Sequence, residues 1–277
     1  MAKTEKSTKM ITLSARMQAL ANMVTEGNRI CDLGCDHGWL SIYLVQHKIS
    51  PCALAMDVRK GPLMQAAAHV REAGLGKYIT LRLSDGLAGY SKGEADTLIC
   101  AGMGGPLMRR ILAADLAKAD SFRELILQPQ SEIASFRSFL RESGWCVLRE
   151  DMVLEEGKFY PMMKAVPAED ASGRETEPED GQEKPEEKEP VPPEILQKPE
   201  REPIPPELSD RFGPILLLER HPVLWEYLKR EWKKHRELKA ALLAAPGSRR
   251  AGERLSELSV EITYLKEAAK LYGKDYD

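Results

Sequence analysis

The stretch CDLGCDHGWL, residues 31–40, places acidic side chains and glycines where an apolar run gives way to helix-like sequence. Gly34 permits a tight turn, and in an open α/β sheet the first strand-to-helix turn is where nucleotide-like ligands bind. Asp36 stands where a dinucleotide-binding loop would have its second glycine. A carboxylate repels a pyrophosphate but tolerates a ligand that carries an ammonium and a sulfonium. The pattern therefore favours S-adenosylmethionine over NAD or FAD, with a purely structural turn, capped by Asp32 and Asp36, as the alternative.

Two later strand ends add acidic residues to the same predicted site. Asp57 closes the second apolar run, 25 positions after Asp32, and an acidic residue there can accept hydrogen bonds from ribose hydroxyls. Asp85 closes the third run, and Gly86 beside it lets an adenine ring lie close. Each aspartate alone is typical of a turn or a cap, but three at successive strand ends indicate one binding rim.

A fourth strand end, LICAGMGGPLM at residues 98–108, offers no acid, base or nucleophile. The backbone around Ala101, Gly102 and Met103 is predicted to hold the methionine end of the cofactor or the substrate base. Met103 has a flexible apolar side chain that fills gaps, so we expect it to shape the floor of the pocket.

These strand ends require a sheet that brings them to one edge. Apolar strand-like runs alternate with amphipathic stretches, which predicts βαβ units and a mainly parallel, Rossmann-like α/β sheet with a closing antiparallel pair. We expect strands near 29–34, 52–58, 78–86, 95–102 and 124–130, helices near 14–24, 39–47, 61–75, 105–119 and 133–144, and two closing strands within 145–166.

Composition divides the chain into three parts. The net charge is +3 over residues 1–165, −10 over 166–210 and +4 over 211–277. The predicted domain is therefore 11–165, followed by an acidic linker at 167–209 and a helical domain at 210–277. Ten of the 18 prolines lie within 167–206, without an aromatic residue, so the linker is predicted to be disordered. The two basic parts are compatible with a polyanionic partner.

The last part is predicted to be a coiled-coil hairpin, since apolar residues recur at helical spacing on both sides of the break APGS. A helical hairpin that only packs is the alternative. The stripes are Leu224, Leu228, Trp232, His235, Leu238 and Leu242, then Leu255, Leu258, Ile262, Leu265, Ala269 and Tyr272.

The five cysteines are odd in number and mostly lie in strand-like runs, which favours reduced thiols in a cytoplasmic protein. Cys31 and Cys35 have no second cluster, so no metal is expected. The start, MAKTEKSTKM, has no apolar signal core, and no run is long enough to cross a bilayer. We expect a cytoplasmic protein, and a monomer by default.

The motifs DLGCDHGWL, SDGL, AGMGG, LILQP and EEGKFYPMM, in this order, resemble the bacterial tRNA (adenine-22-N1)-methyltransferase family, also called TrmK. The resemblance implies a class I methyltransferase domain with a coiled-coil domain, S-adenosylmethionine as cofactor and tRNA as partner. Trp39 and Ser41 depart from it, because the family usually has tyrosine and proline there. These departures concern the entrance of the site.

The implied reaction is methylation of adenine N1, which carries a lone pair and needs no general base. Three residues are candidates for a catalytic role. His37 is placed to touch the cofactor or shuttle a proton, Gln128 to read an adenine edge, and Tyr160 to face the substrate. The alternative, purely structural roles are a helix start for His37, a strand terminator before proline for Gln128 and a packed edge-strand aromatic for Tyr160.

Basic side chains on two predicted helices are candidates for phosphate contacts, although such a run is usually a solvated helix face. A methyltransferase acting on another RNA, a protein or a small molecule stays possible at this point, as does an inactive RNA-binding adaptor. The candidates are Arg16, Lys229, Arg230, Lys233, Lys234 and Arg236.

Overall fold

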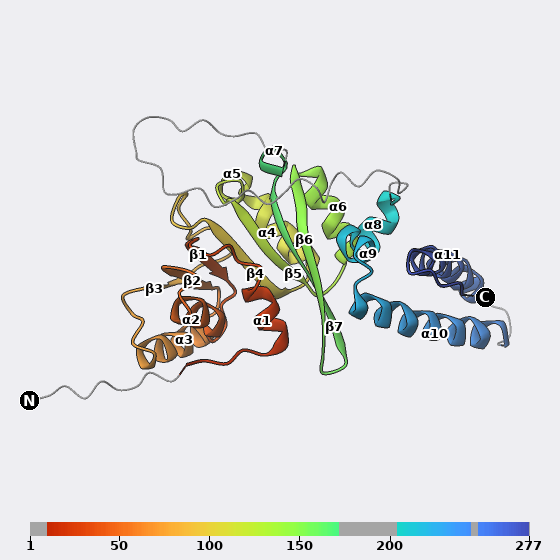
Figure 1. The fold of residues 1–277 in the computed structure, drawn as a ribbon, viewed down its shortest axis with the longest axis horizontal. Coiled ribbons are helices and arrows are strands. Elements are labelled where there is room, and N and C mark those ends of the chain that lie inside the picture. Colours follow the sequence, from red (N-terminus) through yellow and green to blue (C-terminus); the bar gives the residue numbers. More distant parts are fainter. Residues whose placement is uncertain (1–9, 172–203, 245–248, 277) are drawn as a thin grey trace, which may run out of the picture.

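The protein is described by a computed structural model that covers residues 10–171, 204–244 and 249–276 (Figure 1). One seven-stranded sheet, in the order β3-β2-β1-β4-β5-β7-β6, forms its centre. The strands are β1 Ile30–Leu33, β2 Ala53–Asp57, β3 Ile79–Leu83, β4 Thr97–Met103, β5 Glu124–Pro129, β6 Trp145–Glu155 and β7 Lys158–Pro167. The helices packed around them are α1 Ala15–Ala21, α2 Trp39–Gln46, α3 Lys60–Glu72, α4 Gly105–Ala114, α5 Leu116–Ala119 and α6 Ile133–Glu142.

The first five strands pair in parallel, and the β6–β7 hairpin joins β5 in antiparallel fashion, as the alternation predicted. β1, β2 and β5 are buried along their whole length, which explains their continuous apolar sequences. The chain runs outward from β1 to β3 and then returns to β4 on the other side of β1. Such a reversal opens a crevice at the carboxyl ends of the strands.

Successive side chains of the central strands enter cores on opposite faces of the sheet. In β1, Ile30 packs with the cluster beneath α1, α2 and α3, whereas Cys31 and Leu33 pack with the cluster beneath α4 and α6. This period of two is what a sheet covered on both faces requires. The fold class predicted from sequence is therefore confirmed.

One predicted helix is divided. The stretch 105–119 was expected to be continuous, but α4 ends at Ala114 and α5 begins at Leu116. Asp115 between them has an extended φ of −150°, and its carboxylate caps α5 by accepting a hydrogen bond from the Lys118 amide at 3.1 Å. The apolar pattern continues across the break and hides it.

Four further helices follow in the second described part: α8 Pro206–Phe212, α9 Pro214–Leu218, α10 Pro222–Ala244 and α11 Arg249–Leu271. The predicted linker, 167–209, lies mostly outside the described residues. Its described ends are helical, namely α7 at Ala168–Ala171 and the start of α8. α8 begins at Pro206, four residues before the predicted start of the helical domain at 210.

α10 and α11 lie alongside each other in opposite directions. Trp225 stacks on Tyr272 at 5.2 Å between ring centroids, and farther along His235 Nε2 lies 2.9 Å from a Glu261 carboxylate oxygen. Leu228 is fully buried, whereas Leu238, nearer the connection, is 37% exposed. Apolar burial is therefore concentrated at the end that packs on β6. The connecting residues 245–248 lie outside the described part. Within that part, no helix combines the length and apolarity needed to cross a membrane.

A buried ion pair joins the sheet to the C-terminal helices. Arg137 on α6 and Glu150 on β6 approach to 2.8 Å, and both side chains are almost completely buried. Glu150 also accepts hydrogen bonds from the Ile215 and Leu216 amides at the start of α9. Gly213, with φ of +93°, lets the chain pass against this carboxylate. α9 is thus part of the same packed unit as the sheet.

Candidate active site

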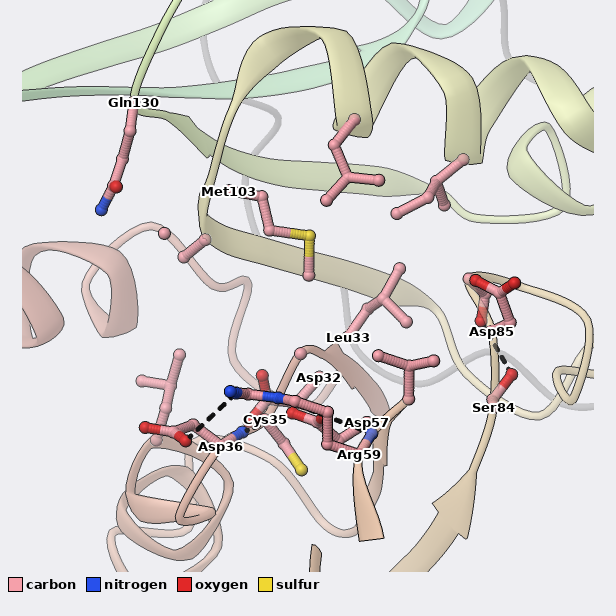
Figure 2. A pocket seen from close by; sticks show the side chains of 18 of the residues that line it. Asp32, Leu33, Cys35, Asp36, Asp57, Arg59, Ser84, Asp85, Met103 and Gln130 are labelled. Atoms are coloured by element: carbon pink, nitrogen blue, oxygen red, sulfur yellow. Dashed lines mark hydrogen bonds and ion pairs between the residues drawn. The ribbon is translucent and has the colours of Figure 1, made fainter. Parts of the chain in front are cut away.

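A cleft of about 770 Å³ opens at the carboxyl ends of β1, β2, β3 and β4 (Figure 2). It lies at the predicted rim and gathers nearly all the residues predicted to bind the cofactor. Those lining it are Asp32, Gly34, Asp36, Asp57, Asp85, Gly86, Ala101, Gly102 and Met103.

Asp32 lies at the bottom of the cleft and is 6% exposed. Its carboxylate accepts a hydrogen bond from the Ser41 hydroxyl at 2.7 Å. Burial raises the pKa of Asp32 to about 6, although the Ser41 hydrogen bond acts in the opposite direction. Among the described residues no basic side chain forms an ion pair with Asp32. Asp32 therefore has no positively charged partner within the described protein. The ammonium group of S-adenosylmethionine would supply one.

Asp57 holds two turns of the cleft together. One of its carboxylate oxygens accepts from the Arg59 amide at 2.8 Å, and the other from the Asp36 amide at 3.3 Å. Asp36 has φ of +49°, a conformation that aspartate adopts more readily than most residues. The Arg59 side chain crosses the cleft mouth towards Asp36, 3.7 Å away (Figure 2). Each oxygen of Asp57 keeps a free lone pair, which suits ribose hydroxyls.

The third rim turn is built by Ser84. Its hydroxyl donates to the Gly86 carbonyl at 2.8 Å and accepts from the Gly89 amide at 2.9 Å. Gly86 has φ of +54°, and a Cβ there would press on Ile111 of α4 at 3.3 Å. The Asp85 carbonyl accepts from the Ala88 amide at 3.2 Å, and the residue is exposed at the rim.

The AGMGG stretch is fixed by main-chain contacts. The main-chain amide of Gln130 donates to the Met103 carbonyl at 2.8 Å. The main-chain amide of Gly105 donates to the Ser131 carbonyl at 3.0 Å. A Cβ at Gly105 would lie 2.5 Å from that same carbonyl, so only glycine admits the close approach. Met103 folds back so that its methyl group touches Gly34, which leaves no room for a side chain there. The methionine side chain therefore lies between the two loops and lines the cleft.

β4 bulges at Gly102, which lines the cleft and has φ of +78°. A Cβ built at this glycine would lie 3.7 Å from Arg16 Nη1 and 3.8 Å from Gln130 Nε2. We call this part of the cleft the Gly102 chamber. It is lined by side-chain donors and by main chain.

Gln128 does not reach this chamber. It is fully buried, its carbonyl oxygen accepts from Arg16 Nη1 at 3.0 Å, and its amide nitrogen donates to the Pro129 carbonyl at 3.2 Å. The prediction that Gln128 reads an adenine edge is therefore wrong, and its role is to hold Arg16. Gln130, two residues later in LQPQ, is the glutamine that faces the cleft. The sequence offered both glutamines, but Gln128 lies within β5 and is buried, whereas Gln130 follows the end of the strand at Pro129.

Arg16 and Tyr160 also differ from their predicted places. Arg16 was expected on an RNA-binding surface, but its guanidinium lies in the cleft wall, over the Tyr160 ring at 5.1 Å. Its amide is held by Glu155 at 3.1 Å. Tyr160 does not line the cleft. It supports Arg16 from behind, because the β6–β7 hairpin packs against α1.

His37 lies outside the cleft, which differs from the prediction that it touches the cofactor. Its ring faces an adjoining groove, and its Nε2 lies 3.5 Å from Asp36. Arg59 and Arg110, which the sequence analysis missed, do line the cleft. The only signal for Arg59 was its position two residues after a strand-end aspartate.

The basic residues predicted to bind RNA from α10 make different contacts. Arg230 donates to the Gly157 carbonyl at 2.6 Å and lies over the Phe159 ring, so it ties α10 to the tip of the β6–β7 hairpin. Lys234 pairs with Glu231 at 3.2 Å. Lys229, Lys233 and Arg236 are exposed and spaced four and three apart, which places them along one side of the helix.

The cysteine thiols near the cleft are buried and have raised pKa values. Cys31, Cys35 and Cys100 are buried near the cleft, and burial raises the pKa of each thiol. All five thiols are free. In the part of the chain that the structure describes, no group of three or more His, Cys, Asp or Glu side chains is arranged to hold a metal ion.

The fold and cleft have close relatives. A curated tRNA (adenine(22)-N(1))-methyltransferase of Bacillus subtilis (strain 168) is 35% identical over 155 residues, which span 56% of this chain and 65% of that protein. The crystal structure of the B. subtilis TrmK tRNA methyltransferase superposes with a TM-score of 0.73 at 26% identity, covering 93% of this chain and 98% of the other.

A Streptococcus pneumoniae protein solved in complex with S-adenosyl-L-methionine superposes with a TM-score of 0.70 at 28% identity, covering 93% of this chain and 99% of that one. A family model described as a methyltransferase domain matches residues 13–163, close to the predicted 11–165. The aspartate-lined cleft at the strand ends lies within that range. The chain belongs to the methyltransferase domain family and, within it, to the TrmK family.

Proposed function

We propose that this protein is an S-adenosylmethionine-dependent tRNA methyltransferase that modifies N1 of the adenosine at position 22. The observation that carries the proposal is the cleft in which buried Asp32 has no cationic partner among the described residues. The names of the relatives and the S-adenosyl-L-methionine complex of the S. pneumoniae protein support it. The region aligned with the curated B. subtilis relative spans 65% of that protein, so the substrate is inferred rather than carried over.

The cofactor would be held by the aspartates of three strand ends. Asp32 would receive its ammonium group at the bottom of the cleft, Asp57 its ribose hydroxyls and Asp85 the amino group of its adenine. Asp36 adds negative charge near the cationic end. Gly34 and Gly86 would let the cofactor lie against main chain.

S-adenosylmethionine supplies a methyl group on a cationic sulfur, and adenine N1 supplies the lone pair that accepts it. The chain therefore has to align the two rather than create a nucleophile. In the Gly102 chamber, the side-chain amide of Gln130 would hydrogen-bond an adenine edge, and the Arg16 guanidinium would fix the nucleotide. Gln128 and Tyr160 act as positioning residues, because both hold Arg16. No acid or base is required at N1.

The side of α10 formed by Lys229, Lys233 and Arg236 would contact tRNA phosphates. Replacing all three by alanine removes three exposed charges, together with the cation–π contacts of Lys229 with Trp225 and of Arg236 with Trp232. We expect tRNA affinity to fall and the salt dependence of binding to become shallower, by about 0.7–0.9 per lost phosphate contact. Replacing Lys239, Lys266 and Lys270 instead controls for net charge. Equal losses in both triple variants would contradict a localised contact.

The decisive experiment incubates unmodified tRNA with the full chain and labelled S-adenosylmethionine, then maps the labelled nucleoside. We expect N1-methyladenosine at position 22 and no label when that adenosine is replaced by guanosine. Label at another base or on protein would refute the assignment, and failure of well-folded protein to bind S-adenosylmethionine in calorimetry would refute an enzyme. With tRNA as substrate we propose a cytoplasmic, monomeric enzyme, and sedimentation with and without tRNA tests the monomer.

A further inference from the structure

A second hollow of about 650 Å³ adjoins the cleft, and we call it the side groove. It shares four wall residues with the cleft, so the two spaces meet beside α1. The shared residues are Arg16, Met17, Cys35 and Asp36, and the remaining wall consists of residues 10–14, His37, Trp39, His69, Glu72 and Ala73.

The side groove contains an aromatic platform. Trp39, the first residue of α2, stacks on His69 of α3 with ring centroids 3.9 Å apart and an angle of 20° between the planes. His69 Nδ1 lies 3.0 Å from the His37 carbonyl, which fixes the imidazole behind the tryptophan. Trp39 is nevertheless 41% exposed. A tryptophan held rigid from one side and left open in a groove is suited to stacking.

We propose that the side groove binds the base of the nucleotide next to the target adenosine, stacked on Trp39. This inference rests on the proposed function. It follows from the position of Arg16, which borders both the side groove and the Gly102 chamber. An RNA strand whose target base enters the chamber passes Arg16, and its neighbouring base then reaches Trp39. Extruding the target base breaks its stacking, and the platform restores stacking to its neighbour.

The carboxylates of the groove favour a base that donates hydrogen bonds. Asp36 and Glu72 on its wall accept from exocyclic amino groups, while Arg59 pairs with Asp36 at 3.7 Å and Arg16 borders the groove. The favoured ligand class is therefore an amino-bearing base, namely adenine, guanine or cytosine. Uracil is disfavoured on the same criterion, since it has no exocyclic amino group to donate to these carboxylates.

The test compares three single variants of the full chain: Trp39→Ala, Trp39→Phe and Tyr78→Ala. Tyr78 is the matched control, because it is an exposed aromatic residue that precedes β3, at the strand end opposite Asp85. Dissociation constants for fluorescently labelled tRNA are measured over a series of salt concentrations. Trp39→Ala is expected to weaken binding about 5- to 150-fold, the effect of one lost base–aromatic stack. Trp39→Phe should restore most of the affinity, and Tyr78→Ala should match wild type.

Two further readouts separate stacking from other roles. The salt dependence of binding should be the same for Trp39→Ala and wild type, because stacking releases no counterions. In methylation assays the loss should fall on KM for tRNA more than on kcat. Intrinsic tryptophan fluorescence should be quenched by tRNA in wild type and much less in Trp39→Phe.

The proposal is overturned if Trp39→Ala binds tRNA as wild type does, or if its salt dependence becomes shallower, which would indicate a backbone contact. A fall in kcat equal to the fall in kcat/KM would also overturn it, since Trp39 would then act on the target base itself. A Trp39→Ala variant that binds no S-adenosylmethionine is misfolded, and the Trp39→Phe fluorescence then decides. Failure of the proposed function is separate, because the binding and quenching measurements need no methyl transfer.

Discussion

Replacing Asp32 by asparagine should stabilise the ligand-free protein while weakening its cofactor binding. The pKa of Asp32 is raised from 3.8 to about 6 by burial, so ionising this carboxyl is harder in the folded than in the unfolded chain. Between pH 4 and 6 the unfolded state has lost a proton that the folded state keeps, and stability therefore falls as pH rises. A shift of two pKa units corresponds to about 3 kcal/mol of folding stability, and this stability is fully lost above pH 6. Asparagine does not ionise and keeps an oxygen for the Ser41 hydroxyl.

The assay is urea unfolding of wild type and Asp32→Asn from pH 4 to pH 8, without ligand. The quantity of interest is the difference in free energy of unfolding between the two proteins, which cancels the titration of other groups. We expect this difference to grow in favour of the variant by about 3 kcal/mol between pH 4 and pH 7, and then to stay level. In calorimetry the variant should bind S-adenosylmethionine about 10- to 150-fold more weakly, as expected for loss of a hydrogen bond to a charged group.

A difference that does not change with pH would refute the reasoning, because Asp32 would then ionise in the folded protein as readily as in the unfolded chain. Wild type offers an independent check. Its affinity for S-adenosylmethionine should rise from pH 5 to pH 7 as Asp32 ionises, with proton release on binding, and Asp32→Asn should show neither effect.

Three further substitutions test the packing around the site. Gly34→Ala should lower the free energy of unfolding by about 1–3 kcal/mol and weaken S-adenosylmethionine binding, since φ is +77° and the new Cβ meets Met103. Adding Met103→Ala to this variant should recover only part of the lost stability in thermal melts. Gly213→Ala should cost about 2–4 kcal/mol in urea unfolding, because its Cβ would lie 2.5 Å from the Glu150 carboxylate, and an unchanged midpoint would contradict the tight junction. Arg230→Ala should cost about 0.5–1.5 kcal/mol through the lost bond to the hairpin tip, with an unchanged salt dependence of tRNA binding; a shallower one would show that Arg230 also contacts phosphate.

Local patterns were enough to locate the strands and the rim of the cleft. Asp32, Asp57 and Asp85 end three apolar runs, and parallel strands necessarily bring such ends to one edge of the sheet. The same reasoning could not separate Gln128 from Gln130, because the choice depends on where β5 ends: Gln128 is buried inside the strand and Gln130 follows its last residue, Pro129.

Long side chains were the second source of error. Arg16 was predicted from its charge, but its position depends on Gln128 and Tyr160, which lie more than a hundred residues away. Arg230 lies in a run of basic residues and yet binds a carbonyl 73 positions earlier in the chain. Neither contact leaves a signal in the neighbouring sequence. The identity of such residues could be predicted, but not their partners.

The wall of the side groove has a practical consequence for making this protein. Residues 10–14 form part of that wall, and the Ile11 amide is fixed by the Gln46 side chain at 3.0 Å. Shortening the chain past Met10 would therefore remove part of the groove wall, although residues 10–14 do not line the cofactor cleft. RNA-binding measurements should use protein that keeps residues 10–14.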